Sequence, residues 1–328
     1  MKQSIGVLLL NIFLLIIEVV QLVLKSFWYS IESLYENFVP PTVKSVRDDI
    51  VLITGGGHGL GKELALRFAR LGAIIVLWDV NQVGTEAVVQ EIKEFNGKAF
   101  AYHCDVSNEK CVEETSEKVK KDVGQVSILI NNAGMVNCRE LLHLSCQQIR
   151  RTLEVNTLAH FWTIRAFLPE MIKKEKGHIV AISSLAGLLG STNLTDYCAS
   201  KFAVNGLMSS LGEELYYKKK NMISLTTVCP AVINTGFAPL PPVRFSSLLP
   251  VLNVTEVADK VVDGILRNRR LIVLPGWLDF WTRLMRLFPW KALQLFGVSL
   301  NYRIEPVRQS KTKVWKIQAK NNHPPRIS

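Results

Sequence analysis

From Asp49 to Leu274, short apolar runs alternate with longer segments in which apolar residues recur every three or four positions. The short runs are typical of buried strands, and the longer segments have the period of amphipathic helices. The predicted strands are Ile50–Thr54, Ala73–Trp78, Ala99–His103, Ser127–Asn131, His178–Ser183, Ile223–Val228 and Leu271–Leu274. The predicted helices are Lys62–Leu71, Thr85–Phe95, Glu109–Asp122, Cys146–Lys174, Asp196–Lys218 and Glu256–Arg267.

Seven apolar runs separated by helices predict an α/β fold. Strands this uniformly apolar are buried on both faces, which is the situation in a parallel sheet covered by helices on each side. We therefore expect a doubly wound, seven-stranded parallel sheet of the Rossmann type, preceded by a hydrophobic N-terminal membrane-anchor helix.

The anchor is predicted from Ile5–Leu24, which is almost continuously apolar. Twenty residues of helix span about 30 Å, the thickness of a hydrocarbon core. Asn11, Glu18 and Gln21 nevertheless fall within roughly 80° of one another on a helical wheel. A helix that spans the bilayer and a helix that lies in one leaflet, with this polar stripe towards the headgroups, both remain open. The break at Pro40-Pro41 then separates the anchor from the globular part.

Positive charge and aromatic residues gather at the other end of the chain. The net charge is +11, and from Asn301 onward seven basic residues face a single acidic one, Glu305. Beside an apolar N-terminus, such a tail fits an anionic membrane surface better than nucleic acid, although a solvated tail is the plain alternative. The amphipathic stretch 276–300 carries Trp277, Trp281 and Trp290 among cations. It is expected to contact the membrane or gate the substrate, with a core helix as the alternative.

The six cysteines are scattered, without a CxxC pair or the spacing of metal ligands. This usage is typical of free thiols in a reducing compartment, and we predict no metal site. A sequon at Asn193 stands four residues before Tyr197, so a glycan there would crowd the site discussed below. The catalytic part is therefore expected to face the cytosol.

A glycine-rich turn, Thr54–Gly61 (TGGGHGLG), follows the first predicted strand and opens the first helix. Glycines in this place let the backbone approach a pyrophosphate, whose charge meets the helix N-terminus. The second strand ends at Asp79, eighteen residues after Gly61, where a carboxylate can accept hydrogen bonds from both ribose hydroxyls and repel a 2′-phosphate. The predicted cofactor is therefore NAD, while His58 keeps NADP open as the alternative.

Tyr197 stands four residues before Lys201 and thirteen after Ser184. A phenol beside an ammonium can donate and accept a proton, because the positive charge is expected to lower the pKa of the phenol. With the nucleotide turn upstream, this set indicates nicotinamide-dependent redox chemistry.

These features together resemble the short-chain dehydrogenase/reductase family over residues 48–275. The motifs are the Thr54–Gly61 turn, Asp105, Asn131–Gly134 (NNAG), Asn156, Ser183–Gly187, Tyr197–Lys201 (YCASK) and Pro230–Thr235. One departure is Ala231, which stands where the family usually has glycine after this proline.

The resemblance implies a role for each catalytic residue. Tyr197 would exchange a proton with the substrate oxygen, and Ser184 would hydrogen-bond that oxygen. Lys201 would hold the nicotinamide ribose and lower the pKa of Tyr197. Asn156 would shape the long helix and hold a water that relays protons to Lys201. The implied cofactor-binding positions are Thr54, Gly55, His58, Gly59, Leu60, Gly61, Asp79, Asp105, Val106, Asn132, Ala133, Gly134, Tyr197, Lys201, Pro230, Val232 and Thr235.

Within the family, the chain resembles a membrane-associated subgroup, that of epidermal retinol dehydrogenase 2 and the lipid-droplet 17β-hydroxysteroid dehydrogenases. This implies NAD-dependent oxidation of a lipophilic alcohol, a retinoid or a steroid, on the cytosolic face of the endoplasmic reticulum or the lipid-droplet surface, by a homodimer. An NADP-dependent carbonyl reductase and a largely non-catalytic droplet protein are the alternatives. The apolar segment 235–253 is expected to form a substrate lid or to pack as core.

The resulting domain map has four parts. Residues 1–40 are the membrane anchor and linker, and 41–275 the catalytic domain. The segment 276–300 is the amphipathic gate, and 301–328 is the basic tail.

Overall fold

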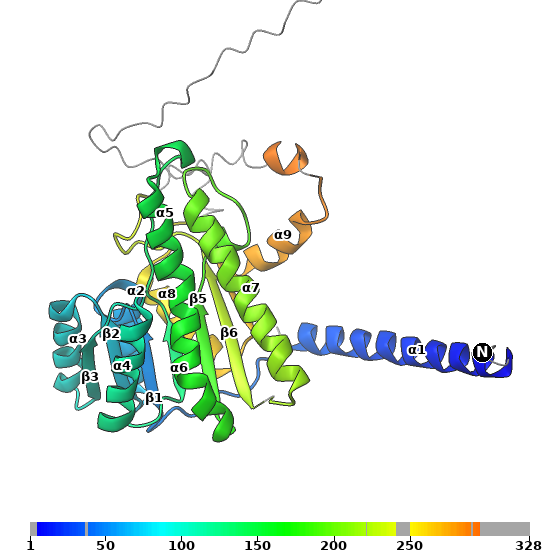
Figure 1. Ribbon diagram of the computed structural model, residues 1–328, viewed down its shortest axis with the longest axis horizontal. Helices are drawn as coiled ribbons and strands as arrows, with labels where there is room; N and C mark the ends of the chain where they lie inside the picture. The colour runs from blue at the N-terminus through cyan, green and yellow to red at the C-terminus, as the bar shows by residue number, and fades with distance from the viewer. Residues whose placement is uncertain (1–4, 37–38, 221, 241–249, 290, 296–328) are drawn as a thin grey trace, which may run out of the picture. The chain divides into compact units, whose positions relative to one another are not determined.

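The computed structural model describes residues 5–36, 39–220, 222–240, 250–289 and 291–295 (Figure 1). The chain divides into two compact units, Met1–Lys44 and Ser45–Ser328. The predicted basic tail, residues 301–328, lies outside the described residues.

The first unit contains one long helix, α1 (Ile5–Tyr35), which extends eleven residues beyond the predicted apolar segment. Its stretch Gly6–Glu32 contains an 18-residue window with a mean hydropathy of 2.7, and none of that window is buried by protein. By length and composition this helix can cross a membrane, and it is the candidate anchor.

The second unit is built on seven parallel strands, which confirms the predicted sheet. They are β1 (Ile50–Thr54), β2 (Ile74–Asp79), β3 (Lys98–His103), β4 (Ile128–Asn131), β5 (Gly177–Ile182), β6 (Ile223–Pro230) and β7 (Leu271–Leu274). Their order is β3-β2-β1-β4-β5-β6-β7, so the winding direction reverses between β1 and β4. In doubly wound sheets, ligands bind at this reversal, beyond the carboxyl ends of the strands.

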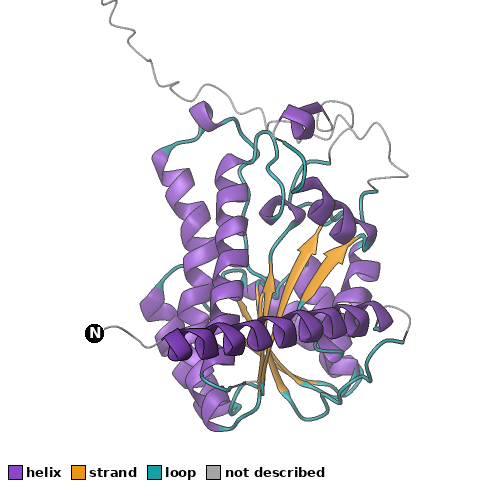
Figure 2. Ribbon diagram, turned by 90° about the vertical axis from the view of Figure 1, so that its right-hand side faces the viewer, coloured by secondary structure: helices purple, strands orange, loops and turns teal. Residues whose placement is uncertain are grey.

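Helices cover both faces of the sheet (Figure 2). They are α2 (Gly59–Arg70), α3 (Gln82–Glu94), α4 (Glu109–Asp122), α5 (Cys146–Leu153), α6 (Ala159–Lys173), α7 (Thr195–Tyr217), α8 (Val254–Leu266) and α9 (Trp277–Met285). Side chains alternate along each strand, so Val51 and Ile53 of β1 join the core under α2, α3 and α8. Leu52 faces the other way and joins the core under α4, α6 and α7.

The chain is helical from Cys146 to Lys173, close to the predicted bounds, but the helix is not regular. After α5 the backbone makes a π-helical turn, Glu154–Leu158, before α6 begins. The cause is tertiary: Asn156 in this turn donates from Nδ2 to the carbonyl oxygen of Met135 at 2.9 Å and accepts from its N–H at 2.8 Å. It also donates to Ser200 Oγ at 3.0 Å. Single π turns inside helices often mark functional positions.

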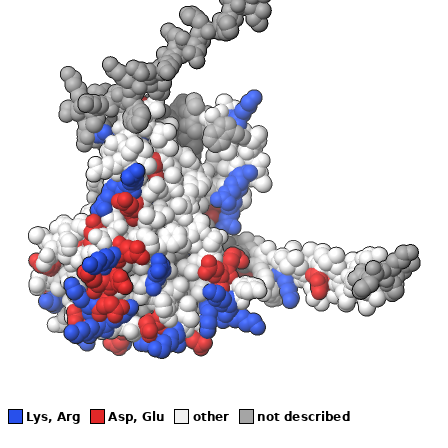
Figure 3. Space-filling model, in the orientation of Figure 1, with Lys and Arg blue, Asp and Glu red and all other residues white. Residues whose placement is uncertain are grey.

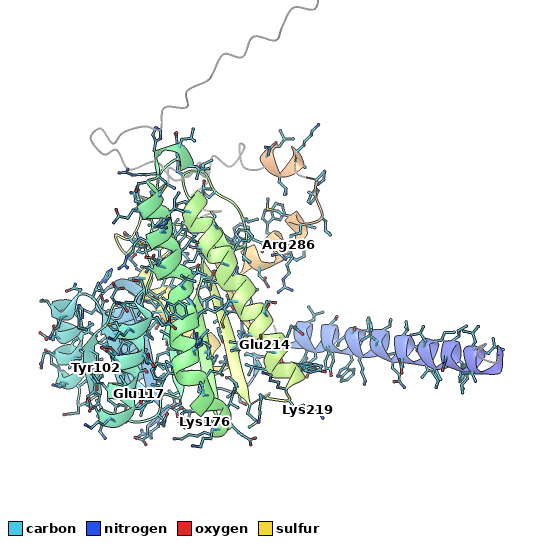
Figure 4. The ribbon with its side chains drawn as sticks, in the orientation of Figure 1. Tyr102, Glu117, Lys176, Glu214, Lys219 and Arg286 are labelled. Carbon is cyan, nitrogen blue, oxygen red and sulfur yellow. The ribbon has the colours of Figure 1, made fainter. Side chains whose placement is uncertain are left out.

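Charge is distributed unevenly over the second unit. In Figure 3 the charged side chains gather over the half where the strands begin, and few appear near the half where the strands end, apart from cations on α9. The labelled Lys176 and Lys219 lie at the first end, and Arg286, at the end of α9, lies at the second (Figure 4). On the face seen in Figure 3, the half that carries the carboxyl ends of the strands is therefore less charged.

Candidate active site

The glycine-rich turn fits tightly against the loop that follows β4. Asn132 donates from Nδ2 to the carbonyl oxygens of Thr54 and Gly55, each at 3.0 Å, and its backbone N–H binds Thr54 Oγ1 at 3.0 Å. Gly55 has a φ of +65°, and a Cβ at Gly61 would overlap the carbonyl of Gly55. Side chains are therefore excluded at both positions, and the backbone amides at the start of α2 stay open to an anionic ligand.

Asp79 closes one side of this turn. Its Oδ2 accepts from the N–H of Gly57 at 2.9 Å and its Oδ1 from the N–H of Asn81 at 2.9 Å. The carboxylate is thus fixed at the end of β2, 8% exposed, beside the glycine-rich turn. A negative charge held here suits ribose hydroxyls and opposes a phosphate on the same ribose.

A second carboxylate, Asp105, lies beyond β3. Its Oδ2 accepts from Arg151 Nη2 at 2.9 Å, and its Oδ1 accepts from the hydroxyl of Ser107 at 2.7 Å. Burial alone would raise the pKa of Asp105, but the hydrogen bonds from Ser107 and Arg151 lower it below its ordinary value. Arg151 also contacts Ser107 and lines the cavity. Nothing in the sequence pattern pointed to Arg151, because α5 reaches Asp105 only in the folded chain.

The predicted catalytic residues Ser184, Tyr197 and Lys201 meet where α7 passes the ends of β5 and β6. Lys201, one helical turn after Tyr197, lies with Nζ 5.7 Å from the centre of the phenol ring and donates to the carbonyl oxygen of Ile182 at 2.8 Å. Ser184 is hydrogen-bonded to the backbone N–H of Ala186 at 3.1 Å and interacts with the hydroxyl of Tyr197. The structure therefore brings Ser184, Tyr197 and Lys201 together.

The electrostatics of this cluster differ from the sequence-based expectation. Burial raises the pKa of the Tyr197 phenol above its ordinary value, and the hydrogen bond with Ser184 lowers it by less than burial raises it. Burial also lowers the pKa of Lys201 to about 8. The protein atoms alone thus keep the phenol neutral, because the apolar surroundings disfavour both charged forms.

The side chain of Asn156 lies near that of Lys201. A Cβ placed on Gly134 would lie 3.4 Å from Asn156 Oδ1 and 3.8 Å from Lys201 Nζ, so the two side chains approach the same point. Glycine at position 134 keeps this point free. The side chain of Asn156 is engaged by Met135 and Ser200, which makes it a structural clamp between the π turn and α7.

These groups line one cavity of 1610 Å³. Nearly all predicted cofactor and catalytic residues border it: Gly55, His58, Gly59, Leu60, Asp79, Asp105, Val106, Asn132, Ala133, Gly134, Ser184, Tyr197, Lys201, Pro230, Val232 and Thr235. Thr54, Gly61 and Asn156 lie behind its wall, where Thr54 and Asn156 hold the loops by hydrogen bonds and Gly61 allows close packing.

The cavity continues past Tyr197 into an apolar compartment. Its lining comes from the segment before α7, from the segment after β6, and from α9 and beyond. It includes Leu185, Leu189, Leu194, Phe237, Trp277, Trp281, Met285 and Leu293. Among the described residues, the charged side chains that line the cavity lie in the half that would hold the nucleotide, apart from Lys201. Of the predicted lid, Phe237 lies 6.3 Å from the Tyr197 ring, whereas Phe245, Leu248 and Leu249 fall outside the described residues.

A family model supports the identification directly. The model described as "short chain dehydrogenase" matches residues 49–239, more than half of the chain. The chain belongs to the short-chain dehydrogenase family. The match spans the glycine-rich turn, the NNAG loop and the Ser184–Tyr197–Lys201 set, so an oxidoreductase is the function class of this site.

Known proteins resemble most of the chain. Human "17-beta-hydroxysteroid dehydrogenase 13" is 38% identical over 300 residues, which cover 92% of this chain and 99% of the relative. Human "Epidermal retinol dehydrogenase 2" is 42% identical over 269 residues, covering 82% and 87%. A crystal structure of a short-chain dehydrogenase/reductase from Burkholderia phymatum in complex with NAD is 25% identical, covers 82% of this chain and 100% of its own, and has a TM-score of 0.68.

A nicotinamide dinucleotide fits the residues present. The glycines of the turn leave a cradle that a Cβ would fill, the carboxylate of Asp79 lies beside this turn, and Lys201 lies beside Tyr197. This arrangement can hold a pyrophosphate against α2 and direct the rest of the cofactor towards Tyr197.

Proposed function

We propose that this protein is an NAD-dependent dehydrogenase that oxidises a lipophilic secondary or allylic alcohol, a 17β-hydroxysteroid or a retinol, at a membrane surface. The observation that carries the proposal is the continuity of one cavity. It runs from a fixed carboxylate at the ribose position, past Ser184, Tyr197 and Lys201, into an uncharged apolar compartment. The names of the two human relatives support the substrate class.

The residues divide the chemistry between them. Ser184 and Tyr197 hold the substrate hydroxyl between their oxygens, which orients the carbon that loses the hydride. An oxidised nicotinamide, when bound, accepts that hydride and adds a positive charge near the phenol. Tyr197 takes the hydroxyl proton, and the Lys201 ammonium stabilises the phenolate form that can do so. The apolar compartment excludes water from the reacting atoms.

The choice of NAD rests on Asp79. Its carboxylate is held by two backbone amides, so it cannot swing away from a cofactor ribose. A 2′-phosphate would meet this negative charge in a partly buried site, where screening is weak. His58, at the start of α2, is the observation that favours the alternative, an NADP-dependent reductase acting on lipid aldehydes or ketones.

Two helices, α1 and α9, support action at a membrane surface. Helix α1 carries an apolar stretch of 27 residues. In the catalytic unit, α9 lines the apolar compartment through Trp277 and Trp281, while Phe280 on the same helix is 71% exposed. An exposed aromatic beside a cavity mouth suits a substrate that arrives from lipid. The proposal extends to the endoplasmic reticulum or lipid-droplet surface, a cytosolic catalytic domain and a homodimer.

The same proposal divides the chain at the predicted boundaries. In this proposal, residues 1–40 anchor the protein in the membrane, and residues 41–275 form the catalytic domain. Residues 276–300 gate the entry of the substrate, and residues 301–328 are the basic tail.

The test is turnover by the full chain in membranes. Membranes that contain the protein are given all-trans-retinol or a 17β-hydroxysteroid with NAD, and the carbonyl product is measured. Tyr197→Phe removes the hydroxyl that takes the proton and is expected to lower kcat by at least 10³-fold while cofactor binding persists. Turnover that survives this change would refute the mechanism.

The second alternative, a surface protein with little catalysis, makes the opposite prediction. Under this alternative, no turnover is expected over a panel of retinoids and steroids with either cofactor. Unchanged targeting of Lys201→Ala would be compatible with both functions. Because such a protein needs no proton donor, the intact Ser184–Tyr197–Lys201 geometry favours the enzyme.

A further inference from the structure

Three nitrogen atoms lie buried beside the catalytic set without a hydrogen-bond partner among the described residues. They are Nδ2 of Asn131 and both ring nitrogens of His160. Asn131 is 3% exposed and His160 is 2% exposed. Buried polar atoms without partners destabilise the fold, so native proteins satisfy nearly all of them, with buried water where side chains do not reach.

The two side chains face the same region of the interior. Thr163, three residues after His160 on α6, donates its hydroxyl hydrogen to Asn131 Oδ1 at 2.8 Å, which holds Asn131 against this turn of helix. In the sheet, Asn131 is in register with the residue before Ile182. The carbonyl of Ile182 is the acceptor for Lys201 Nζ at 2.8 Å. Thr163 Oγ1 also lies 3.2 Å from the carbonyl oxygen of His160, and the ring of His160 interacts electrostatically with Lys201. These contacts place Asn131, His160 and Lys201 on the elements that meet at the end of β5.

The charge states of these groups are complementary. Burial and the ammonium of Lys201 lower the pKa of His160 to about 3, so the ring is neutral and has one acceptor nitrogen and one donor. Cys229 of β6 also faces Lys201, and burial raises the pKa of its thiol to about 11, which leaves it neutral. Lys201 has three N–H donors, one of which binds Ile182.

We propose that Asn131 and His160 hold a buried water molecule that accepts a hydrogen bond from Lys201. The water oxygen accepts from Asn131 Nδ2 and Lys201 Nζ, and one of its hydrogens binds the unprotonated ring nitrogen of His160. This arrangement gives the water three hydrogen bonds, the usual number for a buried water, and satisfies two of the three orphaned atoms. The water stabilises the ammonium form of Lys201, so His160 is a positioning residue that acts through Lys201.

The kinetic test rests on the proposed function. His160→Phe keeps an aromatic ring but removes the acceptor, so the pKa of Lys201 is expected to fall by about one unit from about 8. The ratio of wild-type to variant kcat then grows from about twofold at pH 7 to about eightfold at pH 8.5. His160→Gln, which retains an acceptor and a donor, restores the wild-type profile. A ratio for His160→Phe that stays constant with pH overturns the proposal.

A matched control is His178→Phe. His178 is a buried histidine at the start of β5, whose Nε2 is 2.8 Å from Thr226 Oγ1. Replacing it also removes a buried imidazole, but at the opposite end of the strand from Ile182. Its kcat ratio to the wild type is expected to be independent of pH, and a pH-dependent ratio equal to that of His160→Phe overturns the assignment.

Two measurements need no activity, so they separate this proposal from the proposed function. A crystal structure of the full chain at about 1.5 Å should show a water within about 3.2 Å of Asn131 Nδ2, Lys201 Nζ and a ring nitrogen of His160. The absence of density there overturns the proposal. His160→Phe should also lower the Tm, because the water loses an acceptor. A raised Tm would mean that His160 is unpaired and the proposal is wrong. If His160→Phe does not fold, the crystal structure and His160→Gln decide.

Discussion

The proposed preference for NAD rests on one carboxylate, that of Asp79, and its removal should invert that preference. Asp79→Asn changes the charge with little change in shape. At an effective dielectric of about 20, a phosphate charge about 5 Å away is repelled by about 3 kcal/mol. Losing this repulsion should raise kcat/KM for NADP by about 100-fold, because each tenfold corresponds to about 1.4 kcal/mol.

The same substitution should weaken the use of NAD. A hydrogen bond to a charged acceptor contributes about 1.5–3 kcal/mol, so kcat/KM for NAD is expected to fall by at least tenfold. The ratio of NADP to NAD efficiency therefore shifts by about 10³-fold. The Tm should fall slightly as well, because an amide oxygen can replace only one of the two acceptors that bind Gly57 and Asn81.

The assay measures initial rates with each cofactor at a saturating concentration of one lipid alcohol. Asp105→Asn is the matched control, since it removes a second cavity carboxylate and its pairing with Arg151, at 2.9 Å, without touching the ribose position. It should affect both cofactors alike. A wild-type preference for NADP by tenfold or more, or a ratio in Asp79→Asn that moves less than tenfold, would refute the reasoning.

Three further predictions concern the cradle, the lysine and the cavity mouth. Gly61→Ala forces a methyl group into the carbonyl of Gly55, and should weaken cofactor binding by at least tenfold in a fluorescence titration. Gly206→Ala, in the exposed part of α7 with no atom near the added Cβ, should instead stabilise the fold by about 0.5–1 kcal/mol. Lys201→Met should stabilise the fold below pH 8 by about 2–3 kcal/mol, because the wild type buries an ammonium whose pKa is lowered to about 8. This gain should shrink as the pH rises from 8 towards 10 in chemical denaturation, since the unfolded lysine then loses its proton too; a gain independent of pH would contradict it. Phe280→Asp, at a side chain 71% exposed on α9, should slow turnover of a membrane-dissolved alcohol and leave NAD affinity unchanged. Val83→Asp on α3, 78% exposed, is its control, and equal effects of the two would argue against a membrane-facing α9.

Part of this protein could be predicted from the sequence because the signals are local. Each strand is a short apolar run, and the glycine-rich turn comes directly after the first of them. Tyr197 and Lys201 are four residues apart on one helix, a spacing that puts both on one face. The sheet, the glycine-rich turn and the proximity of Tyr197 to Lys201 therefore followed from neighbours in the chain.

The glycine-rich turn also shows where local signals stop. The sequence indicated flexible glycines, but Asn132, seventy-seven residues after Gly55, holds the turn in place. The interruption of the long helix at Glu154–Leu158 is similar, because nothing in its period announces a π turn. The turn exists because Asn156 satisfies the backbone of Met135 from another loop.

The sequence by itself determined the strand pattern, the phosphate cradle and the order of the chemical groups, since each depends on residue type and short spacing. The tertiary structure decided what depends on burial and on distant partners. It set Arg151 against Asp105, left Asn131 and His160 beside Lys201 with unmet hydrogen bonds, and raised the pKa of Tyr197 where the sequence predicted a lower one. The physical reason is desolvation. A nearby ammonium lowers the pKa of a phenol, but apolar surroundings disfavour the charged forms of both groups, and here burial has the larger effect on the pKa of Tyr197.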